Sequence, residues 1–302
     1  MSALVVFVSL AAAEDVKRPR ITGVAHIAVY AHDPEETIAF YRDFLGFGEP
    51  YRLKRGGGEL HLAFIKINDR QFVEVFPEKA AGTDRLNHIA LEVEDAEAMR
   101  AYLASRGVKV PNKVPVGKIG NANFNIIDPD GHTVEIVQYL PDGWSMRQKG
   151  NNMPDSRIGS AIKHVGIAVG SLDKAMAFYR DILGFGETWR GSSSGKALNW
   201  VNVRVPDGDD YVEFMLYKTA PALDRLGTMH HLCLEVSDVE QAKSTLQGRA
   251  TGRHYTRALE IKTGVNRRRQ LNLYDPDGTR IELMEPKTVD GSPAPSSTAP
   301  PP

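Results

Sequence analysis

The chain has 302 residues, of which 42% are hydrophobic and 25% charged, which is enough for two domains of common size and typical of a globular protein. The formal net charge of −1 provides no overall field, so we expect neither nucleic acid nor a membrane as a partner. The single cysteine, Cys233, excludes an internal disulfide and a cysteine-based zinc site, and its apolar neighbours predict that it is buried.

Residues 1–20 predict a signal peptide and a short lead-in. The apolar run from Ala3 to Ala13 is too short to span a bilayer as a helix, but it has the length of a signal-peptide core. It ends in small residues before Glu14, as at a cleavage site, although the usual positive segment before it is missing. We therefore expect an exported, periplasmic or secreted protein, with a cytoplasmic location as the alternative.

The first half is expected to cover residues 21–141 and to begin with a strand. In residues 21–30, His26, Ala28 and Tyr30 share one face of that strand. Asp33 and Pro34 then suit the start of a helix, which Gly46 ends. Strand-like runs follow at 51–54, 60–67 and 71–76, so the pattern is β-α-β-β-β.

The same unit recurs three more times. The second unit has a strand at 86–93, a helix at 96–106 and strands near 109–111, 123–127 and 133–139. The aperiodic residues 142–158 predict a linker, after which a second half over 159–287 contains units at 162–217 and 229–286. The Pro/Ser-rich tail, 288–302, is expected to be disordered.

Superposing the two halves matches histidine with histidine and glutamate with glutamate on the first and last strands of every unit. The matched pairs are His26 with His164, Glu74 with Glu213, His88 with His231, and Glu135 with Glu282. Any one of these residues alone would be interpreted as a surface or satisfied core residue, because a glutamate on an antiparallel strand often faces water. The repetition of the whole set favours a functional interpretation.

Two imidazoles and two carboxylates in each half suit a borderline divalent cation such as Zn, Ni, Co, Mn or Fe. Such an ion polarises a carbonyl and lowers the pKa of bound water or of an adjacent C–H acid. A glutamate that loosens from the ion could act as a general base, and we expect this catalytic role for Glu135 and Glu282. All eight matched residues are therefore candidate metal ligands. His230 should point to the opposite face from His231 and is not counted.

The second half carries a family signature. The strand His164-Val-Gly-Ile-Ala-Val169 and the helix end Ala175-Met-Ala-Phe-Tyr-Arg-Asp-Ile-Leu-Gly-Phe185 closely resemble the opening signature of glyoxalase I. Over residues 21–287 the chain resembles the vicinal oxygen chelate superfamily, which includes glyoxalase I, methylmalonyl-CoA epimerase, extradiol dioxygenases and bleomycin-resistance proteins. This resemblance implies an α+β, glyoxalase-like fold: four βαβββ units paired into two cupped mixed β-sheets with flanking helices, with the ligands on the concave faces.

The resemblance leaves the pairing of the units open. If each half closes on itself, His26, Glu74, His88 and Glu135 form one site, and His164, Glu213, His231 and Glu282 the other. If units are exchanged, the first and fourth units share one site, and the second and third units share the other.

Three functions are compatible with these residues. The first is a metal-dependent lyase or isomerase of glyoxalase I type, acting on a small molecule that chelates the metal through adjacent oxygens. The second is an extradiol ring-cleavage dioxygenase that uses His164, His231 and Glu282 with Fe(II). The third is a small-molecule-binding protein without catalysis. In each case we expect a monomer or homodimer.

Overall fold

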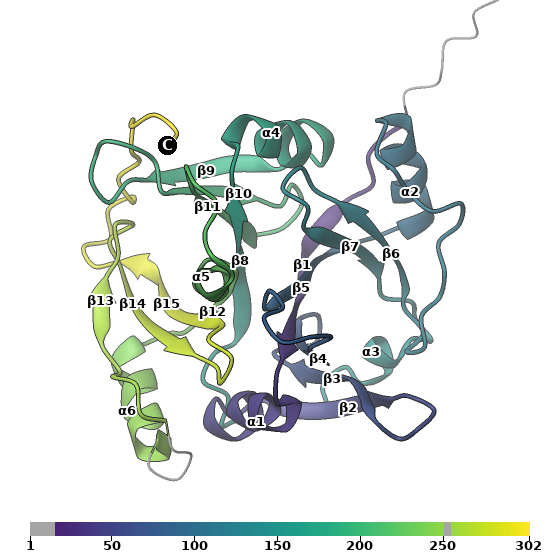
Figure 1. Ribbon diagram of the computed structural model, residues 1–302, viewed down its shortest axis with the longest axis horizontal. Helices are drawn as coiled ribbons and strands as arrows, with labels where there is room; N and C mark the ends of the chain where they lie inside the picture. The colour runs from purple at the N-terminus through teal and green to yellow at the C-terminus, as the bar shows by residue number, and fades with distance from the viewer. Residues whose placement is uncertain (1–15, 251–254) are drawn as a thin grey trace, which may run out of the picture.

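The computed structural model describes residues 16–250 and 255–302, so most of the expected signal peptide lies outside the described residues. These residues form two mixed β-sheets side by side, one from each half of the chain (Figure 1). Within the described ranges, no helix is long and apolar enough to cross a membrane. The expected α+β fold with two repeated halves is confirmed.

The first sheet has the strand order β2-β3-β4-β1-β5-β7-β6. Its strands are β1 (Ile21–Ala31), β2 (Gly48–Lys54), β3 (Leu60–Lys66), β4 (Phe72–Pro77), β5 (Leu86–Val93), β6 (Ala122–Ile127) and β7 (Thr133–Gln138). Its helical segments are α1 (Pro34–Ala39), which continues into the π-helical turn η1 (Phe40–Phe44), then α2 (Ala96–Ser105) and α3 (Trp144–Arg147). The strand expected at 109–111 does not form; a single bridge between Val116 and Ala122 replaces it.

The second sheet has the order β13-β14-β15-β12-β8-β11-β10-β9. Its strands are β8 (Ala161–Val169), β9 (Gly186–Gly191), β10 (Trp200–Arg204), β11 (Tyr211–Leu216), β12 (His231–Glu235), β13 (Ile261–Thr263), β14 (Arg268–Tyr274) and β15 (Arg280–Thr288). Its helical segments are α4 (Leu172–Met176), η2 (Ala177–Ile182), α5 (Leu223–Met229) and α6 (Val239–Ala250). Each sheet therefore pairs two units of the same half, and units are not exchanged between the halves.

Local sequence explains the start of each half. The side chain of Asp33 accepts hydrogen bonds from the first free amides of α1, and Pro34 occupies the first turn, where it needs no amide partner. Gly46 follows the helical segment with φ of +81°, a conformation that glycine adopts readily. In β1, Ile27 and Val29 join the main hydrophobic core, so strand alternation turns His26 toward the other face.

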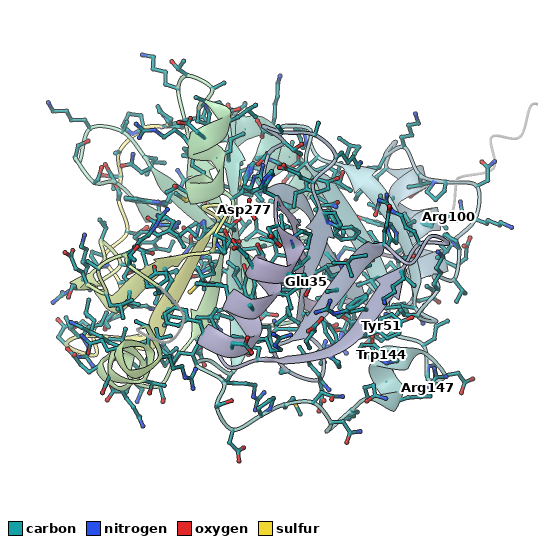
Figure 2. The ribbon with its side chains drawn as sticks, turned by 60° about the horizontal axis from the view of Figure 1, so that its bottom comes forward. Glu35, Tyr51, Arg100, Trp144, Arg147 and Asp277 are labelled. Carbon is teal, nitrogen blue, oxygen red and sulfur yellow. The ribbon has the colours of Figure 1, made fainter. Side chains whose placement is uncertain are left out.

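The two halves meet through β1 and β8, and polar side chains bridge them. The amide of Gln71 donates to Ile162 O (2.9 Å) and accepts from Ile162 N (2.8 Å). Asp277, from the turn between β14 and β15, lies next to α1 of the other half (Figure 2). It accepts from Thr37 Oγ1 of α1 (3.1 Å) and pairs with Arg85, which precedes β5 (3.1 Å). One hydrophobic core cluster contains residues of both halves, which makes the two sheets a single packed unit.

The linker and the tail are both held by specific contacts. Lys66 is fully buried, and its ammonium donates to Gln148 O (2.6 Å) and Asn151 O (2.9 Å) of the linker. The tail was expected to be disordered, but in the structure residues 295–300 lie along the β9 hairpin. There Trp189 Nε1 donates to Pro295 O (2.8 Å), and the backbone of Ser297 donates to that of Arg190 (2.9 Å). Proline carbonyls remain good acceptors, so a proline-rich segment can dock in this way.

Candidate metal centre

The first four predicted ligands come together in the first sheet. They lie on β4, β1, β5 and β7, which are neighbours in the strand order, so their side chains converge on one face. His26 Nε2 lies 2.9 Å from His88 Nε2. Oxygens of Glu74 lie 3.8 Å from both of these nitrogens, and Glu135 Oε2 lies 3.8 Å from the first and 3.2 Å from the second. We call this group, His26, Glu74, His88 and Glu135, the first cup.

The donor set of the first cup fits a divalent metal ion. Two nitrogens bound at about 2.1 Å to one ion and at right angles to each other lie about 3 Å apart, as the two histidine nitrogens do. His88 Nδ1 lies 2.9 Å from Asn87 Oδ1, which can only accept. The proton of His88 therefore sits on Nδ1, and the Nε2 lone pair faces the cup.

The two carboxyl groups of the first cup are electrostatically unequal. Burial raises the pKa of Glu74. Burial also acts to raise the pKa of Glu135, but the neighbouring His88 and His26 and the hydrogen bond from Asn123 outweigh this effect and lower that pKa overall. Asn123 Nδ2 donates to Glu135 Oε1 at 2.8 Å. Burial lowers the pKa of His26 to about 3, so this imidazole is neutral, as a metal ligand must be.

The first cup opens into a cavity of about 270 Å³, and all four of its ligand side chains line that cavity. Its walls include four aromatic residues, Phe64, Phe72, Phe76 and Tyr139, and the polar side chains of His61, Lys118 and Ser145. Tyr51 and Trp144 pack behind them with ring centres 5.1 Å apart and ring planes tilted by 43° (Figure 2). Ser145 and Trp144 belong to the segment expected to be only a linker. Sequence reasoning missed them because no periodic pattern marks them.

The second four predicted ligands form a similar group in the second sheet, which we call the second cup: His164, Glu213, His231 and Glu282. His164 Nε2 lies 3.1 Å from His231 Nε2. Glu213 Oε2 lies 3.9 and 3.5 Å from these nitrogens, and Glu282 Oε2 lies 3.7 and 3.8 Å from them. The sequence match between the halves is therefore also a match in space.

The second cup also contains a residue that sequence reasoning missed. Arg280 Nη2 lies 2.9 Å from His231 Nε2, and equally far from Nδ1 of the same ring. Strand alternation could have identified Arg280, because it precedes Glu282 by two residues and so shares its face. Burial, followed by the charge of Arg280, lowers the pKa of His231 well below its usual value. Burial raises the pKa of Glu282 to about 7.

Cys233 adds a further difference between the cups. It is buried, as expected, and it forms a group with His164 and Glu282 whose candidate ligand atoms lie within 4.8 Å of one another. Its equivalent in the first half is Ala90. The single cysteine thus lies in the second cup, a position that the count of cysteines alone did not suggest.

Several basic residues near the second cup lie outside both cups. His230 points away from the second cup, as expected, and lies 3.2 Å from His132 Nε2 and 3.1 Å from Asp84 of the first half. Three consecutive arginines, Arg267 to Arg269, stand at the start of β14; Arg269 pairs with Glu285 and Arg267 with Asp290. Only Arg268 lines a pocket beside the second cup.

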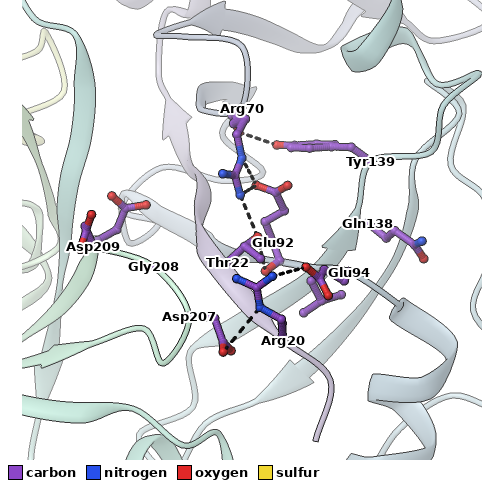
Figure 3. Close-up of a pocket in the computed structure, with 12 residues that line it drawn as sticks. Arg20, Thr22, Arg70, Glu92, Glu94, Gln138, Tyr139, Asp207, Gly208 and Asp209 are labelled. Carbon is purple, nitrogen blue, oxygen red and sulfur yellow. Dashed lines mark hydrogen bonds and ion pairs between the residues drawn. The ribbon is translucent and has the colours of Figure 1, made fainter.

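A separate polar pocket of about 600 Å³ lies where the halves meet (Figure 3). Its charges are largely paired: Arg20 bonds to Glu94 at 2.7 Å, and Arg70 to Glu92 at 2.8 Å. Asp207 accepts from Ile21 N at 3.0 Å. The contact of Asp207 with Ile21 joins the two halves, so we regard this pocket as part of the interface.

The protein thus has two candidate metal centres, each a cup of buried histidine and glutamate on a mixed sheet from two βαβββ-type units. The chain belongs to the Glyoxalase/Bleomycin resistance protein/Dioxygenase superfamily, whose family model matches residues 23–136 and 161–283. This confirms the family resemblance seen in the sequence.

Relatives with different activities match different lengths of the chain. Metapyrocatechase of Geobacillus stearothermophilus is 22% identical over 275 residues, which are 87% of this chain and 80% of that protein. Human mitochondrial methylmalonyl-CoA epimerase is 30% identical over 137 residues, 41% of this chain and 73% of that protein. A probable lactoylglutathione lyase of Synechocystis is 28% identical over 123 residues, 37% of this chain and 92% of that protein.

Solved structures share the fold over nearly the whole chain. The Mn(II)-bound glyoxalase of Novosphingobium aromaticivorans superposes with a TM-score of 0.67 and 18% identity, covering 94% of this chain and 89% of that one. The 2,3-dioxygenase LapB of Pseudomonas sp. KL28 superposes with a TM-score of 0.67 and 17% identity, covering 92% and 97%. The fold is thus common to both kinds of enzyme and does not by itself distinguish them.

Proposed function

We propose that the chain is a metal-dependent lyase or isomerase whose working site is the first cup. Its substrate would be a small molecule that holds the metal through two adjacent oxygens. The observation that carries this proposal is that four ligand side chains of two kinds face one cavity of about 270 Å³. A donor set of two imidazoles and two carboxylates leaves room for a chelating substrate on a five- or six-coordinate ion.

Each residue of the first cup has a role in this proposal. His26, His88, Glu74 and Glu135 would hold the ion, which, when bound, polarises the substrate oxygens and acidifies the neighbouring C–H bond. Glu135 is held by Asn123 and lies 3.2 Å from His88 Nε2, so it is the better-anchored carboxylate. The nearest histidine nitrogens to Glu74 are 3.8 Å away.

We therefore propose that Glu74 is the general base that moves the substrate proton. The sequence had favoured Glu135 for this role. A base has to swing between the metal and the substrate, and a carboxylate without short anchoring contacts can do so at a lower cost in free energy.

The aromatic side chains on the cavity wall suit an apolar part of the substrate. Lys118, an exposed residue on the cavity wall, favours a negatively charged group near the entrance.

The test is proton exchange in heavy water. The full chain, loaded with Mn(II), would be incubated with thiol adducts of 2-oxoaldehydes and with 2-hydroxycarbonyl compounds, and deuterium uptake at carbon followed by NMR. Glu74→Gln should reduce exchange by a factor of about 100 or more, as expected for loss of a general base. Glu213→Gln, at the matched position of the second cup, is the control and should leave exchange unchanged. Loss of exchange in the control but not in Glu74→Gln would contradict the proposal.

A second candidate function is ring cleavage by an extradiol dioxygenase. It is favoured by the match to metapyrocatechase, which spans 87% of this chain. The ligand set expected for it, His164, His231 and Glu282, is present, but Arg280 lies against His231 Nε2 at 2.9 Å. Oxygen uptake with catechol and Fe(II), measured with an oxygen electrode, would support this function if it depended on the metal and on either cup.

Failure of the chain to bind Zn, Ni, Co, Mn or Fe would favour the third function, a binding protein without catalysis.

A further inference from the structure

We infer that Arg280 takes the place of the metal ion in the second cup, so that the described chain binds one divalent metal ion, in the first cup. This inference rests on the proposed function only in assigning a metal to the first cup. It follows from contacts, charges and packing that differ between the two otherwise matched groups of ligands.

The contact of Arg280 with His231 places a fixed positive charge beside the nitrogen that a metal would need. His231 Nδ1 lies 2.8 Å from Met229 O, a pure acceptor, so a proton on Nδ1 leaves Nε2 as the nitrogen that could bind a metal. Arg280 Nη2 lies 2.9 Å from both ring nitrogens, so the guanidinium is in direct contact with Nε2. Because a guanidinium in a protein keeps its charge, an ion bound at Nε2 would face a fixed positive charge at contact distance.

The two cups also balance their charges differently. Arg280, in contact with His231, and Arg268, in the neighbouring pocket, both act electrostatically on Glu282, so two fixed cations lie near the carboxylates of the second cup. When Glu135 is matched with Glu282, Arg280 corresponds to Thr133 and Arg268 to Asn121 in the first half, and both of these residues are neutral. The first cup therefore has no arginine at these two places to balance Glu74 and Glu135, whereas the second cup has two such arginines nearby.

Packing supports the same conclusion. The ring of His231 lies against Gly166, where an added Cβ would be 2.0 Å from the ring atoms. The matched residue of the first half is Ala28, whose Cβ excludes this ring position. Gly166 thus allows His231 to lie where it meets Arg280.

Access differs as well. All four ligands of the first cup line its cavity. The pocket beside the second cup, about 400 Å³, is instead lined by residues that include Trp189, Arg268 and the tail residues Pro293 and Ala294, and not by the four ligands of that cup. The tail residues and Arg268 thus line the pocket beside the second cup, whereas the ligands of that cup do not.

The experiment counts metal per chain. The full-length protein, purified without a His-tag and stripped with a chelator, would be titrated with Mn(II) by calorimetry and measured by elemental analysis after gel filtration. We expect one equivalent for the wild type, none for His26→Ala, and one for the matched variant His164→Ala. Arg280→Thr, which copies Thr133, should raise the count from one equivalent to two. The reciprocal Thr133→Arg should remove the metal of the first cup.

The outcomes separate this inference from the proposed function. Two equivalents in the wild type, one of them lost in His164→Ala, would overturn the inference and leave the proposed function standing. No metal in the wild type would overturn both. A folded Arg280→Thr variant, judged by circular dichroism, that still binds one equivalent would overturn the role of Arg280.

Discussion

Gln71 and Asp210 stand at matched positions of the two halves, each three residues before the glutamate of its strand, and meet where the halves join. Gln71 Nε2 donates to Asp210 Oδ2 at 3.2 Å. Each also accepts a hydrogen bond from the backbone of the opposite half, from Ile162 N at 2.8 Å and from Val24 N at 3.1 Å, respectively. The repeat thus builds its own interface with near two-fold symmetry.

The first prediction concerns Gln71. Gln71→Ala should lower the free energy of unfolding by roughly 2–4 kcal/mol, because it leaves the buried amide and carbonyl of Ile162 without their partner. Urea unfolding followed by circular dichroism measures this loss. Gln241→Ala, at an exposed position of α6, is the control and should change the free energy by no more than about 0.5 kcal/mol. Equal effects of the two substitutions would show that the bridge contributes little.

The second prediction is a pH dependence at Asp210. Burial raises the pKa of Asp210 from its usual 3.8 to about 6. The native state therefore binds this proton more tightly than the unfolded state, and the contribution of Asp210 to stability falls as pH rises from about 4 to 6. Asp210→Asn should remove that fall, which we expect to be about 1–3 kcal/mol. The check is urea unfolding of both proteins between pH 4 and 7; parallel curves would refute the assignment.

The third prediction concerns the support of a ligand. Asn87→Ala removes the acceptor of His88 Nδ1, so the affinity of the first cup for Mn(II) should fall by roughly 10- to 100-fold. Asn87→Asp keeps an acceptor at this place and should retain more of the affinity. Calorimetric titration gives both constants. An unchanged affinity in the alanine variant would mean that the ring is oriented by other contacts.

The fourth prediction concerns the linker. Lys66→Met keeps most of the side-chain volume but removes the donor to Gln148 O and Asn151 O, which should cost about 2–4 kcal/mol of stability. The released backbone should also become sensitive to limited proteolysis between residues 142 and 158. Lys66→Arg retains donors and should be cut more slowly. Equal cleavage of both variants and the wild type would contradict this role.

The fifth prediction concerns the tail. Removal of residues 293–302 takes away the acceptor of Trp189 Nε1 and uncovers a side chain that is 9% exposed. We expect a red shift of tryptophan emission and a lower melting temperature, because a buried aromatic becomes hydrated. Trp189→Phe provides the reference that assigns the spectral change to this residue. Identical spectra with and without the tail would show that the tail does not cover Trp189 in solution.

Much of the fold could be predicted from local signals in the sequence. The alternation in β1, the Asp33 cap with Pro34, and the glycine ends of helices act over a few residues, so they are visible without a structure. The eight matched histidines and glutamates were visible because a repeated chain shows the same ligands twice. The structure places these residues in two groups of four.

Long-range contacts decided the rest. Whether β1 and β5 join within one sheet, or are exchanged between halves, depends on strand partners far apart in the sequence. The contact of Arg280 with His231 depends on two strands lying parallel in register and on the missing Cβ of Gly166. Residues 142–158 and the proline-rich tail carry no periodic pattern, and their order comes from partners such as Lys66 and Trp189. The local sequence thus specified the strands and the ligands, and only tertiary packing distinguished the open first cup from the arginine-filled second.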